Sequence, residues 1–434
     1  MSPGLIGTLG VLLLFLLLGG GVPIAASLAL IGIAGLAVLI SPEAAVIKAG
    51  AVAFDVAGRY ELGVLPLFLL MAHICFAAGA SRDFFRASAS FVGHRPGGLA
   101  LASIAACGAF GAISGSSLAT VATIGLVAYP EMRRHNYSAA LSTGAITAGG
   151  SIGSLVPPSA ALIVFGILTE QSIGRLFTAA IIPAATQGLF YMVVIWIVCS
   201  LRPALGPRLP RAPWSERFAS LARLWDVGLL IFLVMGGIAF GLFSPTEAAS
   251  VGAVGALAVC AWRRELNLAM MRKALADTLR TTGMIYAIII GAIIFSTFIA
   301  ATGVAQGLAD AVTAIHADKT MVTIVMVLVV LSLGMFLDGL ALMTLTVPIF
   351  MPIVSNVGLD PIFFGVVLVR AMEIGFVHPP VGMNVYVMHS IANEVPLTTI
   401  FKGVVPFLIS DLLHVALLVA VPGMVLFLPK LLGV

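Results

Sequence analysis

A seven-residue motif occurs twice in this chain, 222 positions apart, and it constrains the fold more than any other feature. Ile152-Gly-Ser-Leu-Val-Pro157-Pro158 returns as Ile374-Gly-Phe-Val-His-Pro379-Pro380. Because Gly and Pro interrupt regular backbone, their recurrence at one spacing inside apolar sequence indicates two copies of one architecture. The sequence therefore predicts a duplicated fold with a helix broken at the same place in each half. The same gap-free shift also aligns Gly19 with Gly241, Pro23 with Pro245 and Pro130 with Pro352.

The composition places both halves in a membrane. Hydrophobic residues make up 61% of the 434 residues and charged residues only 9%, and the mean hydropathy is +1.16. Apolar runs of this kind suit helices that cross a bilayer. The net charge of +4 comes from basic residues in short loops, which set membrane orientation, and no nucleic-acid motif is present. We therefore expect an all-α polytopic membrane protein with lipid, and no nucleic acid, as a partner.

Two further features of the chain fit this class. Its four cysteines stand alone in apolar segments without metal spacing, so we expect buried, unpaired thiols. The first apolar run follows Met-Ser-Pro-Gly-Leu, which has no basic residue, so we expect a first membrane span and no signal peptide there.

The apolar runs divide the chain into two matching halves joined by a basic connector at 201–225. In the first half, 1–200, we expect scaffold spans within 4–80 (4–19, 23–41 and 61–80, with an amphipathic stretch at 42–60), a polar arm at 81–96, a hairpin at 97–130, a broken helix at 139–168 and a span at 176–200. In the second half, 226–434, we expect scaffold spans within 227–302 (227–243, 248–262 and 283–302, with an amphipathic stretch up to 281), a hairpin at 320–352, a broken helix at 361–391 and a span at 403–428.

The hairpin of the first half is predicted to be re-entrant. Two apolar arms flank Ala112-Ile-Ser-Gly-Ser-Ser117, each about 13 residues and so about 20 Å long as a helix, against roughly 30 Å of hydrocarbon. Neither arm is therefore expected to span the bilayer. The tip would end inside the membrane and line a cavity within the protein. The second hairpin would have its tip near Leu337-Asp338-Gly339.

Five crossings in each half, an odd number, require the second half to be inverted relative to the first. The basic residues agree with this topology: with the connector in the cytoplasm, 16 of the 22 Lys and Arg residues lie on that side, and Arg370 lies within a span. This bias places both termini outside. The basic residues on the outer side are Lys48, Arg59, Arg175, Lys319 and Lys430.

Inverted repeats with paired hairpins and broken helices are the architecture of a secondary transporter. The N-terminus of a half-helix offers N–H groups to an anion, whereas C-termini and unwound carbonyls offer oxygens to sodium. We expect sodium ligands at Ser114, Gly115, Thr120, Gly149 and Gly153 in one half, and at Asp338, Gly339, Thr344, Gly375 and Gly382 in the other. We expect substrate contacts from Ser116, Ser117, Ser159, Arg370, His378 and Asn384.

Each of these residues also has a structural interpretation. Small hydroxyl residues allow helices to pack closely in lipid, and Asp338 either coordinates a cation or caps the second hairpin arm. Arg370 costs roughly 2.5–3.5 kcal/mol if unpaired in a span, and Glu373 lies three residues on along the same face. Arg370 is therefore either half of a structural ion pair or a counter-charge for a substrate carboxylate. His378 either meets substrate or is a structural histidine.

At these residues the chain resembles the large, DctM-like membrane subunit of the tripartite ATP-independent periplasmic (TRAP) transporters. His378 and Asn136 depart from the family pattern, which often has Thr before Pro-Pro and Gly before Tyr137. The matching stretches cover nearly the whole chain: Ser114-Gly-Ser-Ser-Leu-Ala-Thr120, Pro130-Glu-Met132, Gly149-Gly-Ser-Ile-Gly-Ser-Leu-Val-Pro-Pro-Ser159, Ser244-Pro-Thr-Glu-Ala-Ala249, Asp360-Pro361, Glu373-Ile-Gly375 and Pro379-Pro-Val-Gly-Met-Asn384.

The resemblance implies sodium-driven import of an organic acid across a bacterial inner membrane by an elevator motion. It also implies two protein partners, a small four-helix membrane subunit and a periplasmic substrate-binding protein. The residues alone leave two alternative functions open. One is a sodium/dicarboxylate carrier without a binding protein. The other is an intramembrane serine protease built on Ser114, for which His73, His378 and His389 supply no base at a recognisable spacing.

Overall fold

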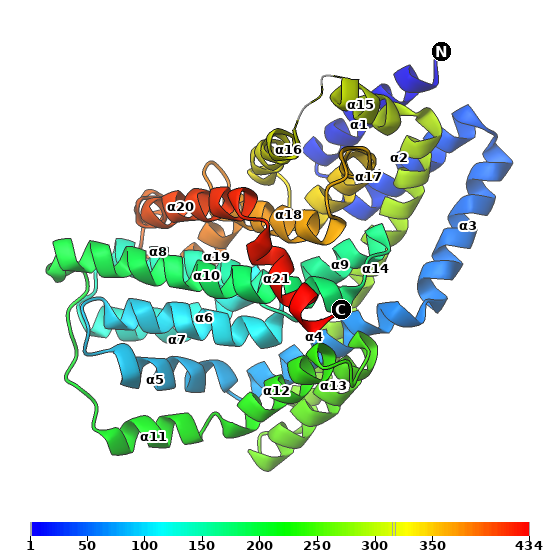
Figure 1. Cartoon of the computed structure of the whole chain (residues 1–434). Coiled ribbons are helices and arrows are strands. Elements are labelled where there is room, and N and C mark those ends of the chain that lie inside the picture. The colour runs from blue at the N-terminus through cyan, green and yellow to red at the C-terminus, as the bar shows by residue number, and fades with distance from the viewer. Residues whose placement is uncertain (1, 315, 317, 434) are drawn as a thin grey trace.

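The chain is helical throughout the residues that its computed structural model describes, which are 2–314, 316 and 318–433 (Figure 1). Twenty-one α-helices and three short 3₁₀ helices cover this part of the chain, which contains no strand. The four cysteines are buried and unpaired. The all-α class and the thiol state are confirmed.

The first half and the connector contain eleven of the α-helices and the three 3₁₀ helices. Their bounds are α1 (Pro3–Gly19), α2 (Ile24–Leu39), α3 (Pro42–Gly58), η1 (Tyr60–Gly63), α4 (Val64–Ala77), α5 (Ala80–Val92), α6 (Gly98–Ser114), α7 (Ser117–Arg134), α8 (Ala139–Ser151), η2 (Ile152–Ser154), α9 (Ala160–Thr169), α10 (Ile173–Leu201), η3 (Pro203–Leu205) and α11 (Trp214–Ala222).

The second half contains the remaining ten α-helices. Their bounds are α12 (Trp225–Ala239), α13 (Pro245–Trp262), α14 (Leu268–Thr302), α15 (Val304–Ala314), α16 (Lys319–Gly334), α17 (Gly339–Val357), α18 (Pro361–Gly375), α19 (Met383–Ile391), α20 (Leu397–Ala420) and α21 (Gly423–Leu432).

The repeat seen in the sequence is present in the helices. Shifted by 222 positions, the hairpin α6–α7 falls on α16–α17, and the broken helix α8–α9 falls on α18–α19. The Pro157–Pro158 and Pro379–Pro380 peptide bonds are both cis. The arm helix α5 also has a counterpart, α15, which the sequence analysis did not identify.

Two expected segment boundaries are wrong. The stretch up to 281 and the span at 283–302 form one continuous helix, α14, of 35 residues. In the first half the matching segment breaks after Gly58, where Arg59 is extended with ψ 114°. The positions of α14 that match Gly58 and Arg59 in the repeat, 280 and 281, stay helical. The last span, expected at 403–428, is instead two helices separated at Val421 and Pro422, because Pro restricts the residue before it to extended geometry.

The estimated arm length of the hairpins is also wrong. α6 and α7 have 17 and 18 residues. The polar end of α7, through Arg134, stays helical and lengthens that arm. α17 has 19 residues and is long and apolar enough to cross a membrane, as are four other spans, or five if α11 and α12 count as one helix bent by 52°. Length alone therefore does not show that these hairpins are re-entrant. That assignment depends on the contacts that their tips make.

Each hairpin packs on its own broken helix and on that of the other half. α6 contacts α8 and α16 contacts α18, while α7 packs on α19 and α17 on α9. Glycine permits the closest approaches: a Cβ on Gly111 would lie 2.7 Å from Gly153 Cα, and one on Gly375 would lie 2.6 Å from the Gly334 carbonyl carbon. Within each half, the hairpin thus packs backbone to backbone on its broken helix.

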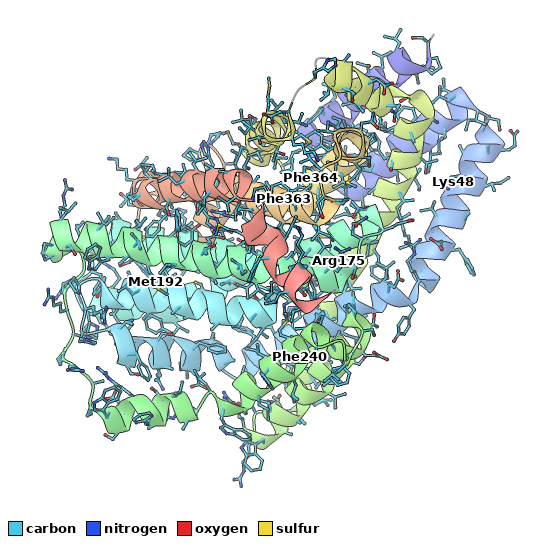
Figure 2. All side chains as sticks on the ribbon, viewed as in Figure 1. Lys48, Arg175, Met192, Phe240, Phe363 and Phe364 are labelled. Atoms are coloured by element: carbon cyan, nitrogen blue, oxygen red, sulfur yellow. The ribbon has the colours of Figure 1, made fainter. Side chains whose placement is uncertain are left out.

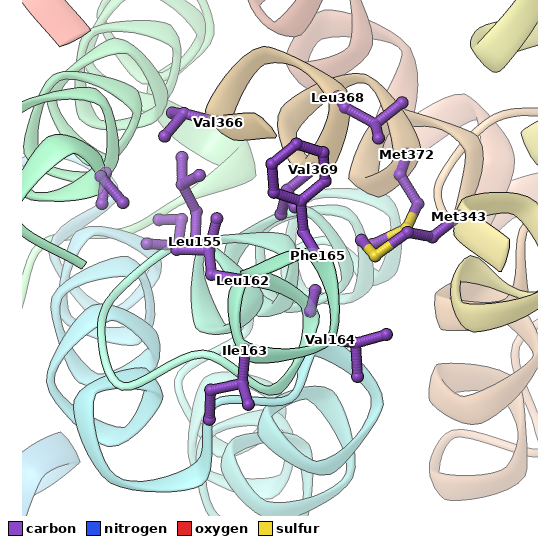
Figure 3. Packing of buried hydrophobic residues seen from close by; sticks show 14 of the residues in the cluster. Leu155, Leu162, Ile163, Val164, Phe165, Met343, Val366, Leu368, Val369 and Met372 are labelled. Carbon is purple, nitrogen blue, oxygen red and sulfur yellow. The ribbon is translucent and has the colours of Figure 1, made fainter. Parts of the chain in front are cut away.

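Apolar side chains fill the space where the two broken helices meet. Figure 3 shows Leu162 and Phe165 of α9 facing Val366 and Val369 of α18. The centroids of the Phe165 and Phe364 rings lie 6.3 Å apart. Figure 2 shows Phe363 and Phe364 among the packed helices, whereas Lys48 lies on the outer edge of α3. This packing joins the two broken helices.

The expected Arg370–Glu373 pair is wrong. Arg370 Nη2 donates to Asp411 Oδ1 at 2.5 Å, and its Nε donates to His414 Nδ1 at 3.2 Å. Arg370, Asp411 and His414 are all 0% exposed. The partner lies 41 residues away on α20, so helical spacing within α18 gave no sign of it. Arg370 is therefore half of a structural ion pair that joins α18 to α20.

Asp411→Ala should lower the free energy of unfolding by about 3–5 kcal/mol, because it leaves a buried guanidinium without a counter-charge. Thermal denaturation in detergent measures this loss. The double variant Arg370→Met with Asp411→Leu removes both charges and should recover most of the stability. An Asp411→Ala variant as stable as the unmodified protein would contradict the assignment.

Candidate functional site

A cavity of about 670 Å³ opens where the two hairpin tips meet the scaffold. The tips and the end of α18 form one wall, and α4 and α14 form the facing wall. The polar and charged lining residues are His73, Ser114, Ser116, Ser117, Thr123, Ser154, Lys273, Asp277, Thr281, Asp338 and Glu373.

The first tip turns between two helix ends. α6 ends at Ser114, and Gly115 has a left-handed φ of 56°, which a residue with a side chain rarely adopts. Ser116 then caps α7, accepting from Ala119 N at 3.4 Å. Ser114 Oγ bonds Thr120 Oγ1 at 2.9 Å, and Thr120 Oγ1 donates to the Ser116 carbonyl at 2.7 Å. The tip thus presents the last carbonyls of α6 and the first N–H groups of α7.

This tip is bonded to both broken helices. Ser117 N donates to Ser154 Oγ at 2.8 Å, and Ala160 N donates to the Gly115 carbonyl at 3.3 Å. From the other half, Asn384 Nδ2 donates to Ser117 Oγ at 2.7 Å. The first hairpin therefore ends inside the protein, among interrupted backbone, as its re-entrant assignment requires.

The second tip is centred on Asp338, which caps α17. Leu340 N donates to its Oδ1 at 3.2 Å, and Ala341 N donates to its Oδ2 at 3.3 Å. Asp338 and Gly339 line the cavity opposite the first tip. The capping interpretation therefore has direct contacts, and coordination of a cation by Asp338 stays a prediction.

The structure brings together six of the sixteen expected site residues at the cavity wall: Ser114, Gly115, Ser116, Ser117, Asp338 and Gly339. Thr120 and Asn384 lie directly behind, bonded to lining hydroxyls. Ser159 caps α9 through Leu162 N and donates to the Ser154 carbonyl. The other seven line no part of this cavity: Gly149, Gly153, Thr344, Arg370, Gly375, His378 and Gly382.

Most of these seven have packing contacts in place of cavity contacts. A Cβ on Gly149 or Gly153 would meet Cys107 or Thr120, and Thr344 Oγ1 donates to the Ala341 carbonyl at 3.0 Å. His378 is partly exposed, with Nδ1 against the Pro379 carbonyl. Gly382 has a φ of 63° and starts α19. Their roles in ion or substrate binding stay predictions.

Glu373 is a site residue that the sequence analysis missed. It is 0% exposed and lines the cavity. Neither carboxylate oxygen has a hydrogen-bond partner among the described residues, although the Ser117 and Ser154 hydroxyls lie beside it. The sequence signal was an acid inside a span, but that charge was assigned to Arg370.

The charges around the cavity are predominantly negative. Glu373, Asp338 and Asp277 face one ammonium group, on Lys273, and one imidazole, on His73. Such a wall attracts cations. No group of three or more His, Cys, Asp or Glu side chains suited to a metal ion occurs in the described part of the chain, so hydroxyl, carbonyl and single carboxylate oxygens are what a cation would meet.

The first tip has no arrangement for nucleophilic catalysis. The Ser114 hydroxyl bonds to Thr120 and to the Ser116 carbonyl, so no base activates it among its described partners. This removes the structural ground for the protease interpretation.

Comparison with known proteins agrees with this geometry. Residues 11–424 match the family model of the tripartite ATP-independent periplasmic transporter, DctM component. The chain is 36% identical over 382 residues to the C4-dicarboxylate TRAP transporter large permease protein DctM of Pseudomonas aeruginosa, covering 88% of each chain. It is 33% identical over 374 residues to the sialic acid TRAP transporter large permease protein SiaM of Vibrio cholerae, covering 86% of this chain and 87% of the relative.

A solved transporter shares the fold. The YdaH transporter of Alcanivorax borkumensis superposes with a TM-score of 0.63 at 16% identity, over 85% of this chain and 87% of that chain. At this identity the likeness concerns the fold alone, and it confirms a multi-span transporter architecture. The relatives are permeases, so the protein is not an enzyme. The chain belongs to the tripartite ATP-independent periplasmic transporter family, as a DctM component, the large membrane permease.

Proposed function

We propose that this permease imports an organic acid, driven by sodium, across the inner membrane of a bacterium. It would work by an elevator motion, with a small four-helix membrane subunit and a periplasmic protein that delivers the substrate. The observation that carries the proposal is the cavity itself. Hairpin tips from both halves of the chain converge on one polar wall, opposite a scaffold wall that is mainly apolar.

The polar wall suits sodium. Oxygen atoms of Ser114 and Thr120 lie together at the C-terminus of α6, where the helix dipole is negative. The buried Glu373 carboxyl group lies nearby without a hydrogen-bond partner among the described residues, and in its ionised form it would need a cation as partner. Sodium at the tips would provide that partner.

The same cavity offers positive groups from both walls to an organic acid. α7 and α17 both begin at the cavity, behind Ser116 and Asp338, and Lys273 stands among the lining residues on α14. Helix N-termini and an ammonium group attract carboxylates. The two relatives described above carry names that specify C4-dicarboxylates and sialic acid, which are both organic acids.

The opposite wall suits a sliding motion. α4 and α14 face the tips mainly through apolar side chains, among them Leu69, Ala72, Phe76, Met284 and Ile285. Because few polar contacts would break, the hairpins and broken helices could move against this surface as one body. The cavity reaches Met270 and Lys273, near the basic end of α14, which the positive-inside rule places in the cytoplasm. In the proposed mechanism, a cavity open on this side would belong to the inward-facing state.

Proteoliposomes that contain this chain and its small partner should accumulate a carboxylate only with an inward sodium gradient and liganded binding protein. The measurement is uptake of labelled substrate. Equal uptake with potassium in place of sodium would overturn the sodium coupling. Equal uptake without the binding protein would favour the rival, a two-component sodium/dicarboxylate carrier.

Ser114→Ala with Ser116→Ala should raise the sodium concentration needed for half-maximal uptake by about tenfold or more, since a bond to a charged group contributes about 1.5–3 kcal/mol. A matched control is Ser41→Ala with Ser172→Ala, which removes two helix caps outside the cavity. If both pairs reduce membrane expression equally and leave sodium dependence unchanged, the hydroxyls serve packing only.

Glu373→Gln should reduce sodium-driven uptake by about tenfold or more while leaving the protein folded, because the amide keeps the shape and removes the charge that binds sodium. Glu265→Gln, at an exposed position, controls for the loss of one carboxylate. Uptake in Glu373→Gln equal to that in the control would exclude a role for this charge.

A further inference from the structure

A second, larger hollow lies away from the transport cavity. Its volume is about 1020 Å³, and it is bounded by α5, α7, α11 and the connector that precedes α11. Five arginines line it: Arg82, Arg86, Arg134, Arg211 and Arg223. Three acids accompany them: Asp83, Glu131 and Glu216.

The acids neutralise one of these five arginines, Arg134. Asp83 is bound at 2.6 Å by Arg263, a residue outside the lining, which also binds Asp226 at 2.7 Å. Glu131 lies within 3.6 Å of Arg134. The remaining four arginines make no side-chain hydrogen bond and no ion pair with any described residue: Arg82, Arg86, Arg211 and Arg223. One hollow thus collects four unpaired guanidinium groups and one free acid, Glu216.

Helix α11 has two opposite faces, and only one of them belongs to this hollow. Glu216, Ser220 and Arg223 line it from one side of the helix. On the other side, Trp214 and Phe218 are 59% and 61% exposed, and Leu221 follows them on the same face. Figure 1 shows α11 at the periphery, beyond α5. An apolar, aromatic face opposite a polar face is the pattern of a helix that lies in a membrane interface.

A buried arginine fixes this helix in place. The Arg217 guanidinium lies 4.9 Å from the Trp214 ring centroid and 5.8 Å from the Phe91 ring centroid on α5. Because it is held between these rings, α11 presents its polar face to α5 and its apolar face outward. The connector borders this hollow, and the positive-inside rule places the connector in the cytoplasm. A helix α11 lying in that interface would bring the hollow to the level of the lipid phosphates.

We propose that this hollow binds the phosphate-bearing headgroup of an anionic phospholipid. Guanidinium groups bind phosphate oxygens in pairs of parallel hydrogen bonds, and an anionic lipid supplies the charge that the protein lacks here. Free phosphate has the same chemistry, but it gives no reason for the exposed apolar face of α11. The headgroup would join α5, which leads into the first hairpin, to α11, which connects the two halves.

The test is a titration of the purified full-length chain with phosphatidylglycerol, measured by native mass spectrometry and by thermal shift. Arg82, Arg86, Arg211 and Arg223 are each changed to Gln, which should weaken phosphatidylglycerol binding by about tenfold or more. A control with the same loss of charge changes exposed arginines outside the hollow: Arg202, Arg208, Arg272 and Arg280. The control should bind as the unmodified chain does.

Several outcomes would overturn the proposal. Equal weakening in both variants would show a diffuse charge effect, and equal binding of phosphatidylcholine would show that the anionic headgroup is not recognised. Displacement of the lipid by millimolar inorganic phosphate alone would assign the hollow to a free anion. Loss of a co-purifying membrane subunit, with lipid binding intact, would make it a protein interface. If the fourfold variant does not fold, Arg86→Gln with Arg211→Gln takes its place.

Discussion

The structure depends on one constraint: interrupted backbone within a membrane must find its hydrogen-bond partners inside the protein. Two hairpins and two broken helices expose such groups, and they satisfy each other. Ser117 N donates to Ser154 Oγ, Ala160 N to the Gly115 carbonyl, and Asn384 from the second half to Ser117. A single copy of the unit would lack the partner that the other copy supplies.

This mutual satisfaction explains why the closest contacts fall on small residues. Gly111 meets Gly153 in one half, and Gly334 meets Gly375 in the other, with no room for a Cβ. In lipid, close approach of this kind replaces much of the hydrophobic driving force between helices. The Arg370–Asp411 pair adds a charged link between α18 and α20 that is wholly removed from water. Together these contacts hold the polar atoms of the tips at one fixed place.

The protein separates its charges between two hollows of opposite sign. The transport cavity has carboxylates at Glu373, Asp338 and Asp277 and a single ammonium group. The peripheral hollow has four arginines without ion pairs in the described chain. The first arrangement fits the proposed transport of a cation with an anionic substrate, and the second fits the proposed binding of an anionic lipid. Asp83 also lines the peripheral hollow, but it is bound by Arg263 and so does not neutralise these four arginines.

The sequence by itself determined the duplication, the places of the breaks and the residues at the tips, because Gly, Pro and N-cap residues act on the backbone locally. Asn136, for example, has a left-handed φ of 58°, which Asn tolerates by its own local preference. Only the tertiary structure decided the continuity of α14, the partner of Arg370 and the position of Glu373 in the cavity wall. These depend on which helix faces which. A spacing of three residues put Glu373 beside Arg370 along the chain, but Asp411, 41 residues away, lies closer in space.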